Sequence, residues 1–161
     1  MRKNQEKLEI SWEEYFMGIA LMVAQKSHDP SSKVGAVIVN EKNQIVATGY
    51  NDFPEQVKKD SFSWAREGEW LETKYPYVVH AEMNALANRT QSFTNCTLYV
   101  TLAPCNECAK NLVAAGIKEV CFYEDKYPDK REFVAAKRML DKAKVKWHMY
   151  EKKGKKVEIE L

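Results

Sequence analysis

Apolar side chains recur at helical spacing from residue 12 onward, and this stripe predicts the first helix. The stripe consists of Trp12, Tyr15, Phe16, Ile19 and Val23. Ser11 precedes it and Glu14 follows three residues later, which is the spacing of a capping box at a helix start. We therefore expect a helix over about 12–26 that buries the stripe and ends before Asp29-Pro30.

Two runs rich in β-branched and apolar residues, 34–39 and 44–50, then predict an antiparallel hairpin. The segment 51–79 follows, and it shows no regular period. Ordered segments of this length usually carry function. Trp64 and Trp70 within it indicate that the segment is pinned to the body of the protein.

The second half of the chain alternates between strand-like and helix-like patterns. The predicted elements are a helix from near 80, a strand over 96–102, a helix over 104–115, a strand over 119–123, a helix over about 129–142 and a strand through 145–149. Pro104 suits the first turn of its helix, and Gly116 terminates that helix. Asp129 and Glu132 have the spacing of a second capping box. This order predicts an α/β fold, a three-layer α-β-α sandwich around a mixed five-stranded sheet.

Length and composition suit a single domain over residues 1–161, with 45% hydrophobic and 30% charged residues. No apolar run reaches the roughly 20 residues of a membrane-spanning helix, and the polar segment 1–9 lacks the features of a secretory signal. The net charge of +2 is too small to indicate nucleic-acid binding by itself. Two of the four cysteines form a C-x-x-C pair, which favours metal binding in a reducing compartment. We therefore expect a cytoplasmic or nuclear protein.

The most informative motif is His80-Ala81-Glu82, followed by Pro104-Cys105-Asn106-Glu107-Cys108. One imidazole and two thiolates can hold a zinc ion and leave its fourth position open for water, as catalytic sites do. Both halves of the motif fall at predicted helix starts, where the helix dipole favours the thiolate form of Cys105 and Cys108. The pattern is identified as the H-x-E…P-C-x-x-C signature of zinc nucleobase deaminases.

This reading gives Glu82 two tasks in turn. Its carboxylate first takes a proton from the water at the open position, and it then delivers protons to the ring nitrogen and to the leaving amine. The oxygen of the water attacks the amidine carbon, and ammonia leaves. The expected site therefore has one catalytic carboxylate beside one zinc ion per chain.

The competing interpretation of the same residues is a structural zinc site, which four protein ligands would close. The candidates for a fourth ligand are Cys96, Cys121, His28 and His148. Both cysteines lie in apolar strands, where a free cysteine behaves as a small core residue. Both histidines lie where surface or capping roles are usual, so we expect the fourth position to stay open.

Over nearly the whole chain, from Trp12 to about Trp147, the sequence resembles deoxycytidylate (dCMP) deaminases. The matching stretches are 12–17, 29–36, 49–51, 73–82, 104–110, 115–120 and 125–127. The resemblance implies a cytidine deaminase-like fold and the reaction of dCMP and water to dUMP and ammonia, which supplies thymidylate synthesis. It also implies a nucleotide substrate and a homo-oligomer, typically a hexamer.

The resemblance further implies how a nucleotide is held. Asn51 would bond the sugar, and peptide groups around Ala81 and from Thr101 to Ala103 would read the pyrimidine edge. A 5′-phosphate needs cationic or hydroxyl donors. The candidates are Lys33, Lys126 and Tyr127, because each lies at the end of a predicted helix or strand that is close to the site in the sequence. The alternative for the two lysines is solvated surface, and for the tyrosine it is packing in a loop.

One loop departs from the family pattern, in which Gly-Tyr-Asn continues as Gly-x-Pro-x-Gly and helps to bind an effector nucleotide. Here Asp52 and Gln56 replace the two glycines, while Pro54 is kept. Glycine permits close backbone approach, and the charges of Asp52 and Glu55 would repel phosphates. We therefore expect activation by dCTP and inhibition by dTTP, and with them any Mg²⁺ that accompanies the effector, to be weakened, altered or absent.

Two further interpretations remain open at this point. A deaminase acting on polynucleotides would use a basic surface. The residues that could form one are Lys142, Lys144, Lys146, Lys152, Lys153, Lys155 and Lys156, interleaved with acidic residues. A non-catalytic, deaminase-like scaffold is the second; the intact motif with its ionisable Glu82 argues against it.

Overall fold

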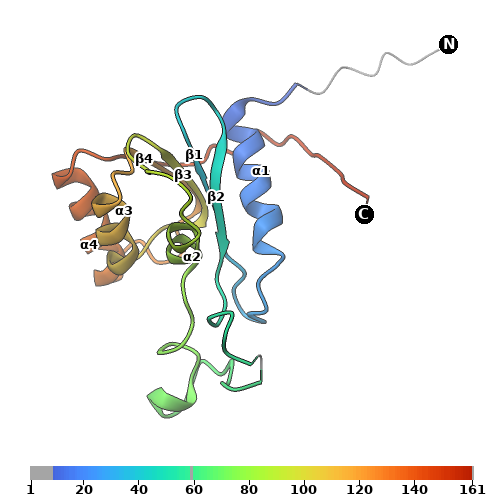
Figure 1. Cartoon of the computed structure of the whole chain (residues 1–161), viewed down its shortest axis with the longest axis vertical. Helices are drawn as coiled ribbons and strands as arrows, with labels where there is room; N and C mark the ends of the chain where they lie inside the picture. Colours follow the sequence, from blue (N-terminus) through green and yellow to red (C-terminus); the bar gives the residue numbers. More distant parts are fainter. Residues whose placement is uncertain (1–8, 59, 161) are drawn as a thin grey trace.

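The computed structural model describes residues 9–58 and 60–160, so the polar segment 1–8 lies outside the described residues (Figure 1). The helices and strands are α1 (Trp12–Ala24), β1 (Gly35–Val39), β2 (Ile45–Tyr50), the 3-10 turn η1 (Trp70–Glu72), α2 (Ala81–Ala87), β3 (Thr97–Leu102), α3 (Asn106–Ala114), β4 (Glu119–Glu124), α4 (Arg131–Lys142) and β5 (Lys146–Met149). Every predicted helix and strand is present, and the predicted boundaries differ by a few residues at most.

The strands form a mixed five-stranded sheet in the order β2-β1-β3-β4-β5. β1 is antiparallel to both β2 and β3, whereas the β3–β4 and β4–β5 pairs are parallel. The hairpin and the β–α alternation predicted from the sequence account for this mixture, because a short turn joins antiparallel strands and a helical crossover joins parallel ones.

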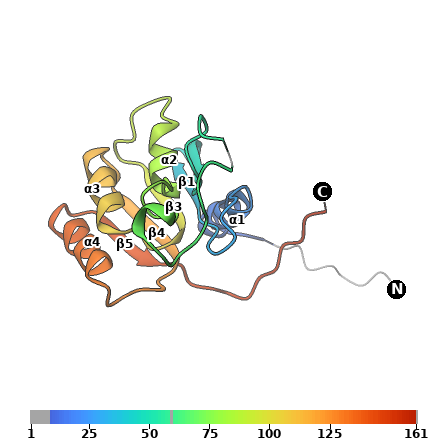
Figure 2. The ribbon, with the colours of Figure 1, turned by 90° about the horizontal axis from the view of Figure 1, so that it is seen from below.

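The helices cover both faces of the sheet, with α1 on one face and α2, α3 and α4 on the other (Figures 1 and 2). β1 is buried along its whole length because both of its faces are covered. Its side chains alternate between two apolar clusters: Ala36 and Ile38 join the cluster under α2 to α4, whereas Val37 and Val39 join the one under α1. The predicted three-layer sandwich is confirmed.

The start of α1 is capped as predicted, but its buried face is shifted. Glu14 accepts a 2.6 Å hydrogen bond from the Ser11 amide, and the Ser11 hydroxyl accepts one of 3.2 Å from the Glu14 amide. The residues that α1 buries are Phe16, Met17, Ala20 and Ala24. Trp12 and Tyr15 are 59% and 41% exposed, so the expectation that they are buried is wrong. Trp12 stacks on Phe16 instead of entering the layer beneath the helix.

The second predicted capping box is wrong. Lys130, not Asp129, is the N-cap residue of α4, and its side chain makes no capping hydrogen bond. The carboxylate of Glu132 instead accepts a 3.0 Å hydrogen bond from Arg131. A neighbouring guanidinium therefore competes successfully for the carboxylate that a capping box would need.

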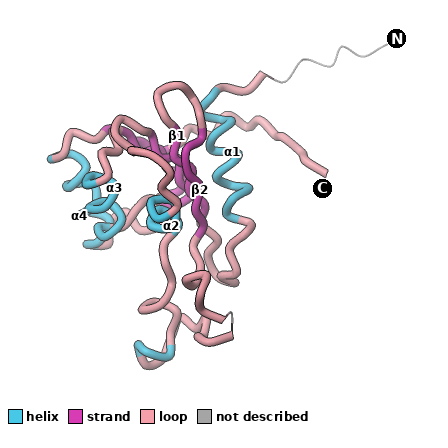
Figure 3. Tube along the Cα trace, in the orientation of Figure 1, coloured by secondary structure: helices cyan, strands magenta, loops and turns pink. Residues whose placement is uncertain are grey.

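The segment 51–79 projects from one end of the sheet and is irregular apart from η1 (Figure 3). A bridge between Asp52 and Val79 closes its base. Trp64 stacks on buried Phe53 with ring centroids 4.1 Å apart, which pins this part as predicted. Trp70 is 64% exposed, so the same expectation is wrong for it, because it lies on the 3-10 turn away from the body. No helix within the described residues has the length and apolar character needed to cross a bilayer.

Candidate active site

A cavity of about 710 Å³ lies where the starts of α2, α3 and α4 meet the segment 51–79. Side chains from all of these elements line it, and they differ in character. The apolar part of the lining includes Val34, Val78, Leu102 and Phe133. The charged part has three basic residues, Arg66, Lys74 and Lys130, and four acidic ones, Asp29, Glu82, Glu107 and Glu132. A partly apolar cavity with a few convergent polar groups is the usual form of a small-molecule site.

His80, Cys105 and Cys108 come together where α2 and α3 begin, and His80 and Cys105 line the cavity. His80 is the N-cap residue of α2 and Cys105 that of α3, so both halves of the motif stand at helix starts, as predicted. The His80 Nδ1 atom lies 3.5 Å from the Cys105 Sγ atom and 3.3 Å from the Cys108 Sγ atom. Side chains at these separations can bind one tetrahedral metal ion.

Within the described residues this ligand cluster contains three side chains, and none of the four candidates for a fourth ligand joins it. Those candidates are Cys96, Cys121, His28 and His148. Three protein ligands would leave the fourth position of a tetrahedral zinc ion open, as in a catalytic site, whereas a structural site is closed by four ligands. Two soft sulfur ligands and an imidazole are a donor set that suits zinc.

Glycine at position 49 brings α2 close enough to the sheet to hold the site. A Cβ atom at Gly49 would lie 2.2 Å from the backbone nitrogen of Ala85 and 2.4 Å from the carbonyl oxygen of Ala81. Asn84 also donates a 2.7 Å hydrogen bond to the Tyr50 carbonyl. The beginning of α2, which carries the histidine and the glutamate of the motif, is therefore fixed against β2.

The protonation of the three candidate ligands is coupled. A hydrogen bond from the Cys108 thiol lowers the pKa of Cys105 to about 4, and the same bond raises the pKa of Cys108. The hydrogen bond to Cys105 raises the pKa of His80 to about 9. The imidazole of His80 and the thiol of Cys108 thus each hold a proton next to the Cys105 thiolate. A divalent cation bound between the three side chains would displace both protons.

Glu82 lies in the first turn of α2, is 4% exposed and lines the cavity. Burial raises the pKa of its carboxyl group, while the neighbouring His80 and a hydrogen bond from the Cys108 thiol act in the opposite direction. A buried carboxyl group with a raised pKa is the usual form of a catalytic acid–base group.

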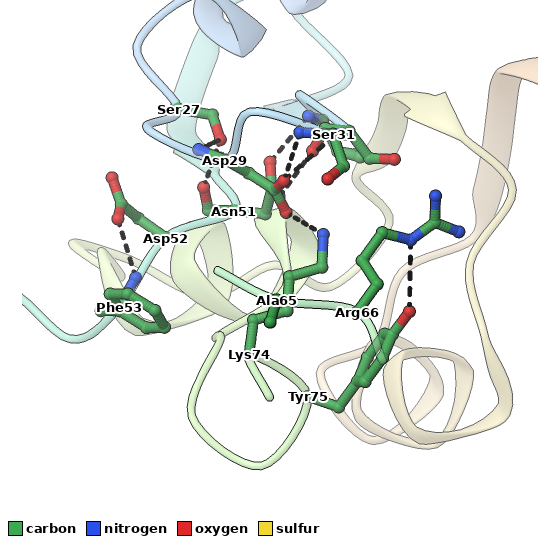
Figure 4. A network of polar contacts seen from close by, with 12 residues as sticks. Ser27, Asp29, Ser31, Asn51, Asp52, Phe53, Ala65, Arg66, Lys74 and Tyr75 are labelled. Atoms are coloured by element: carbon green, nitrogen blue, oxygen red, sulfur yellow. Dashed lines mark hydrogen bonds and ion pairs between the residues drawn. The ribbon is translucent and has the colours of Figure 1, made fainter. Parts of the chain in front are cut away.

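Asn51 lines the cavity, but its side-chain amide already makes hydrogen bonds within the protein (Figure 4). Its Nδ2 atom donates to the Ser32 carbonyl at 2.8 Å and to the Asp29 carboxylate at 3.3 Å. Its Oδ1 atom accepts a 2.7 Å hydrogen bond from the Val34 amide. Asp29 also pairs with Lys74 at 2.5 Å, and both side chains are buried. The Asn51 amide can therefore accept one further hydrogen bond from a ligand, through the second lone pair of Oδ1.

The other predicted substrate contacts divide into two groups. Ala81, Ala103 and Tyr127 line the cavity. Thr101 does not, because its hydroxyl faces the sheet and accepts a 3.1 Å hydrogen bond from the Gly35 amide.

The two predicted lysines also lie outside the cavity lining. Lys33 donates to the Gln25 carbonyl, and Lys126 pairs with Glu124 at 3.3 Å.

The cations that do reach the cavity are Arg66, Lys74 and Lys130, and sequence reasoning missed all three. Arg66 donates to the Tyr75 hydroxyl at 3.4 Å (Figure 4), and the Lys130 ammonium lies 4.2 Å from the centre of the Tyr127 ring. Lys74 lies within 73–82, one of the stretches that match the family, so the sequence offered a signal for its role in the cavity. Arg66 comes from the irregular segment, where spacing gives no orientation.

A second cavity of about 490 Å³ is lined by the loop that departs from the family pattern. Asp52, Glu55 and Asp60 line it, together with the aromatic rings of Phe53 and Trp64. His28 also lines it and pairs with Asp52 at 2.5 Å. Among the described residues this lining has no lysine or arginine, whereas the first cavity has three of them beside its acidic residues.

Comparison with known proteins agrees with the geometry. Residues 10–124 match the family described as "Cytidine and deoxycytidylate deaminase zinc-binding region". The deoxycytidylate deaminase of Homo sapiens is 47% identical over 162 residues, which is 99% of this chain and 90% of the human protein. The probable deoxycytidylate deaminase of Drosophila melanogaster is 44% identical over 93% of this chain and 78% of its own length.

A solved structure also resembles this chain, that of dCMP deaminase from the cyanophage S-TIM5 in complex with dCMP and dUMP. It superposes with a TM-score of 0.73 and 27% identity, covering 89% of this chain and all of the phage chain. The family match, the identities and the shared fold together assign this chain to the cytidine and deoxycytidylate deaminase family.

Proposed function

We propose that this chain is a zinc-dependent deoxycytidylate deaminase, which converts dCMP and water to dUMP and ammonia. The observation that carries the proposal is the convergence of His80, Cys105 and Cys108 at a cavity that the buried Glu82 also lines. The proteins that match most of this chain carry the same name, which supports dCMP as the substrate.

His80, Cys105 and Cys108 would hold one zinc ion, which would supply Lewis-acid chemistry. Glu82 accepts one proton from the attacking water as its oxygen bonds to the amidine carbon of the pyrimidine, and it passes this proton to the ring nitrogen. The same carboxylate then takes the remaining proton of the added hydroxyl and gives it to the exocyclic amine, so that the carbon–nitrogen bond breaks and ammonia leaves. Burial of Glu82 keeps its pKa high enough for its acid form to serve in the second half of this cycle.

The rest of the substrate is held by the cavity lining. Backbone groups at Ala81 and Ala103 face the pyrimidine. Because both N–H groups of Asn51 are engaged, we propose that the sugar hydroxyl donates a hydrogen bond to Asn51 Oδ1.

We further propose that the 5′-phosphate is held by Arg66, Lys130 and the Tyr127 hydroxyl, since these groups line the cavity. Lys74 is paired with Asp29 and contributes mainly to the shape of the wall. Lys33 and Lys126, the candidates chosen by chain order, lie outside the lining and have weaker support than these three residues.

The test is ammonia release from dCMP, CMP, deoxycytidine, dCTP and single-stranded DNA. We expect dCMP to have the highest kcat/KM. Arg66→Gln should raise the KM for dCMP at least tenfold and leave deoxycytidine turnover unchanged, whereas the matched variant Lys33→Gln should change neither. Equal turnover of dCMP and deoxycytidine would contradict the phosphate assignment, and release of no ammonia by zinc-loaded protein would favour the scaffold interpretation.

The polynucleotide alternative has little support. Within the C-terminal basic segment, Lys155 pairs with Glu14 at 3.1 Å and Lys156 pairs with Glu158 at 2.5 Å. These pairs neutralise part of the charge that a nucleic acid would need. Turnover of single-stranded DNA above that of dCMP would reverse this preference.

We propose that control by effector nucleotides is weak in this protein. Asp52, Glu55 and Asp60 line the second cavity, so a triphosphate there would meet like charge unless Mg²⁺ accompanied it. The measurement is the rate against dCMP concentration with and without dCTP and Mg²⁺. A large shift of this curve to lower dCMP concentration would refute the proposal.

We also propose a homo-oligomer, with the hexamer implied by the family resemblance, that works in the cytoplasm and supplies dUMP for thymidylate synthesis. Exposed apolar side chains on α1 support association: Trp12, Tyr15, Leu21 and Met22 are between 37% and 59% exposed. Light scattering of the full chain measures the mass directly, and a monomer at micromolar concentration would contradict this proposal.

A further inference from the structure

A second group of metal-ligand side chains lies on the opposite face of the sheet, beneath the start of α1. It consists of Glu13 from α1, Cys121 from β4 and His148 from β5, and we name it the α1-face cluster. The His148 Nε2 atom lies 2.6 Å from a Glu13 carboxylate oxygen, and the Cys121 Sγ atom lies 3.4 Å from the same oxygen. All three ligand atoms lie within 4.8 Å of one another.

The sheet register explains why these residues meet. Cys121 and His148 are direct partners in the parallel β4–β5 pair, so their side chains stand next to each other on one face. Glu119 lies two residues before Cys121 and therefore shares that face. α1 packs over this face and places the carboxylate of Glu13 above the two strands.

The surroundings of the α1-face cluster suit a bound cation. Cys121 is fully buried, whereas the side chains of His148 and Glu13 are 44% and 36% exposed, so an ion can reach the site from solvent. The second ring nitrogen of His148 lies 3.8 Å from a Glu119 carboxylate oxygen. A carboxylate behind the free nitrogen is the usual partner of a metal-bound histidine, because it fixes the ring and raises its basicity.

We propose that the α1-face cluster is a second zinc site, bound through Glu13, Cys121 and His148, with Glu119 as a positioning residue. One thiolate, one imidazole and one carboxylate form a donor set typical of zinc. Ligand atoms around a tetrahedral zinc ion stand about 3.4 Å apart. The exposed Glu13 and His148 side chains must therefore separate slightly from their 2.6 Å contact.

Occupation of this site would link α1 to β4 and β5 through one ion, in place of the hydrogen bonds that Glu13 now makes to Cys121 and His148. The site should be weaker than the one in the cavity for two reasons. It offers one sulfur ligand where the cavity offers two, and the charge of Lys153 acts on Glu13. Because it lies across the sheet from the cavity, its loss should leave deamination intact.

The test is the zinc content of the full-length protein after equilibration with zinc and removal of free metal, together with its absorption spectrum after loading with Co²⁺. We expect two metal ions per chain in the wild type and one in His148→Gln, with ammonia release unchanged. His28→Gln is the matched control, since this exposed histidine also pairs with a carboxylate but belongs to neither cluster; it should retain two ions. Glu119→Gln should lower the affinity of the α1-face cluster for zinc about tenfold.

Glu13→Gln serves as an independent variant should His148→Gln fold poorly, and it too should hold one ion. In the Co²⁺ form, His148→Gln and Glu13→Gln should each lose part of the thiolate-to-cobalt absorption. The proposal would be overturned if the wild type bound one ion, or if both His148→Gln and Glu13→Gln still bound two. Either result would mean that His148 and Glu13 form an ordinary ion pair. Cys105→Ser should lose deaminase activity and keep the one ion of the α1-face cluster. This variant tests the second zinc site independently of the proposed enzyme function.

Discussion

Two clusters of histidine and cysteine lie on opposite faces of one sheet, and their surroundings differ. His80, Cys105 and Cys108 stand at helix starts in a cavity, and the pKa of Cys105 falls to about 4. In the α1-face cluster, Cys121 lies in the middle of a strand in an apolar layer, and burial raises the pKa of its thiol. The pKa of Cys105 falls because its sulfur accepts a hydrogen bond from the Cys108 thiol and lies beside His80, whereas Cys121 is desolvated and lies beside the Glu13 carboxylate.

Removing one cysteine from each cluster should give the largest contrast. Cys105→Ser should abolish measurable ammonia release and lose the zinc of the cavity, because a serine hydroxyl is a poor zinc ligand. Cys121→Ser should keep its turnover but lose about 1–3 kcal/mol of unfolding free energy, since a smaller and more polar side chain replaces a buried thiol that packs in the apolar layer. Ammonia release, zinc content and urea unfolding measure these effects. Equal loss of turnover in both variants would remove the distinction between the clusters.

Exchanging one glutamate in each cluster for glutamine should give the next largest difference. Glu82→Gln should lower kcat by about 10⁴-fold while zinc stays bound, because the amide cannot accept the proton of the water. Glu13→Gln should stay within about twofold of the wild type in kcat. Steady-state kinetics and metal analysis are the measurements. A Glu82→Gln enzyme with a near-normal rate would end the proposed mechanism.

Two glycines, Gly49 in β2 and Gly18 in α1, allow a test of packing. Gly49→Ala places a methyl group against the backbone of α2, so it should cost about 1–3 kcal/mol of unfolding free energy. It should also lower kcat by up to about 100-fold through movement of the histidine and glutamate that α2 carries.

Gly18→Ala is the matched control in α1. A Cβ atom there meets no atom of the described residues within 4 Å, so alanine should stabilise the helix by up to about 1 kcal/mol. Urea unfolding and kinetics compare the two variants directly. A neutral Gly49→Ala would show that α2 can shift without harm to the site.

The smallest expected effect concerns the capping box that starts α1. The hydrogen bond from the Ser11 amide lowers the pKa of Glu14 to about 2, from an ordinary value of 4.5. A lowered pKa means that the stabilisation is present above pH 4.5 and is lost as the pH falls toward 2. Glu14→Gln should therefore be less stable than the wild type at pH 6, and the difference should vanish near pH 2. Thermal unfolding across this range measures it; a difference that persisted at pH 2 would assign the effect to packing.

Sequence patterns predicted most elements because their cues are local. Ser11 and Glu14 predicted a cap that exists, since all of its partners lie within one helical turn. Asp129 and Glu132 predicted one that does not exist, since Arg131 competes for the carboxylate. The exposed Trp12 and Trp70 were misjudged for a related reason, because hydrophobicity alone does not say which surface has another element packed against it.

The candidate site shows the same division. His80, Glu82, Cys105 and Cys108 could be assigned from spacing, because each pair lies within one turn of a helix start. Other features required the folded chain: the cationic lining from Arg66 and Lys130, the engagement of the Asn51 amide, and the position of Lys33 outside the cavity.

By itself, the sequence determined the metal-ligand motif, its acid–base partner and the order of helices and strands, because these depend on residues a few positions apart. Only the tertiary structure decided which distant side chains face a common space. Residues 13, 121 and 148 meet because of strand register and the packing of α1, and Arg66 reaches the cavity because of the path of an irregular loop. Register and loop path result from packing summed over the whole chain, and no local pattern encodes that sum.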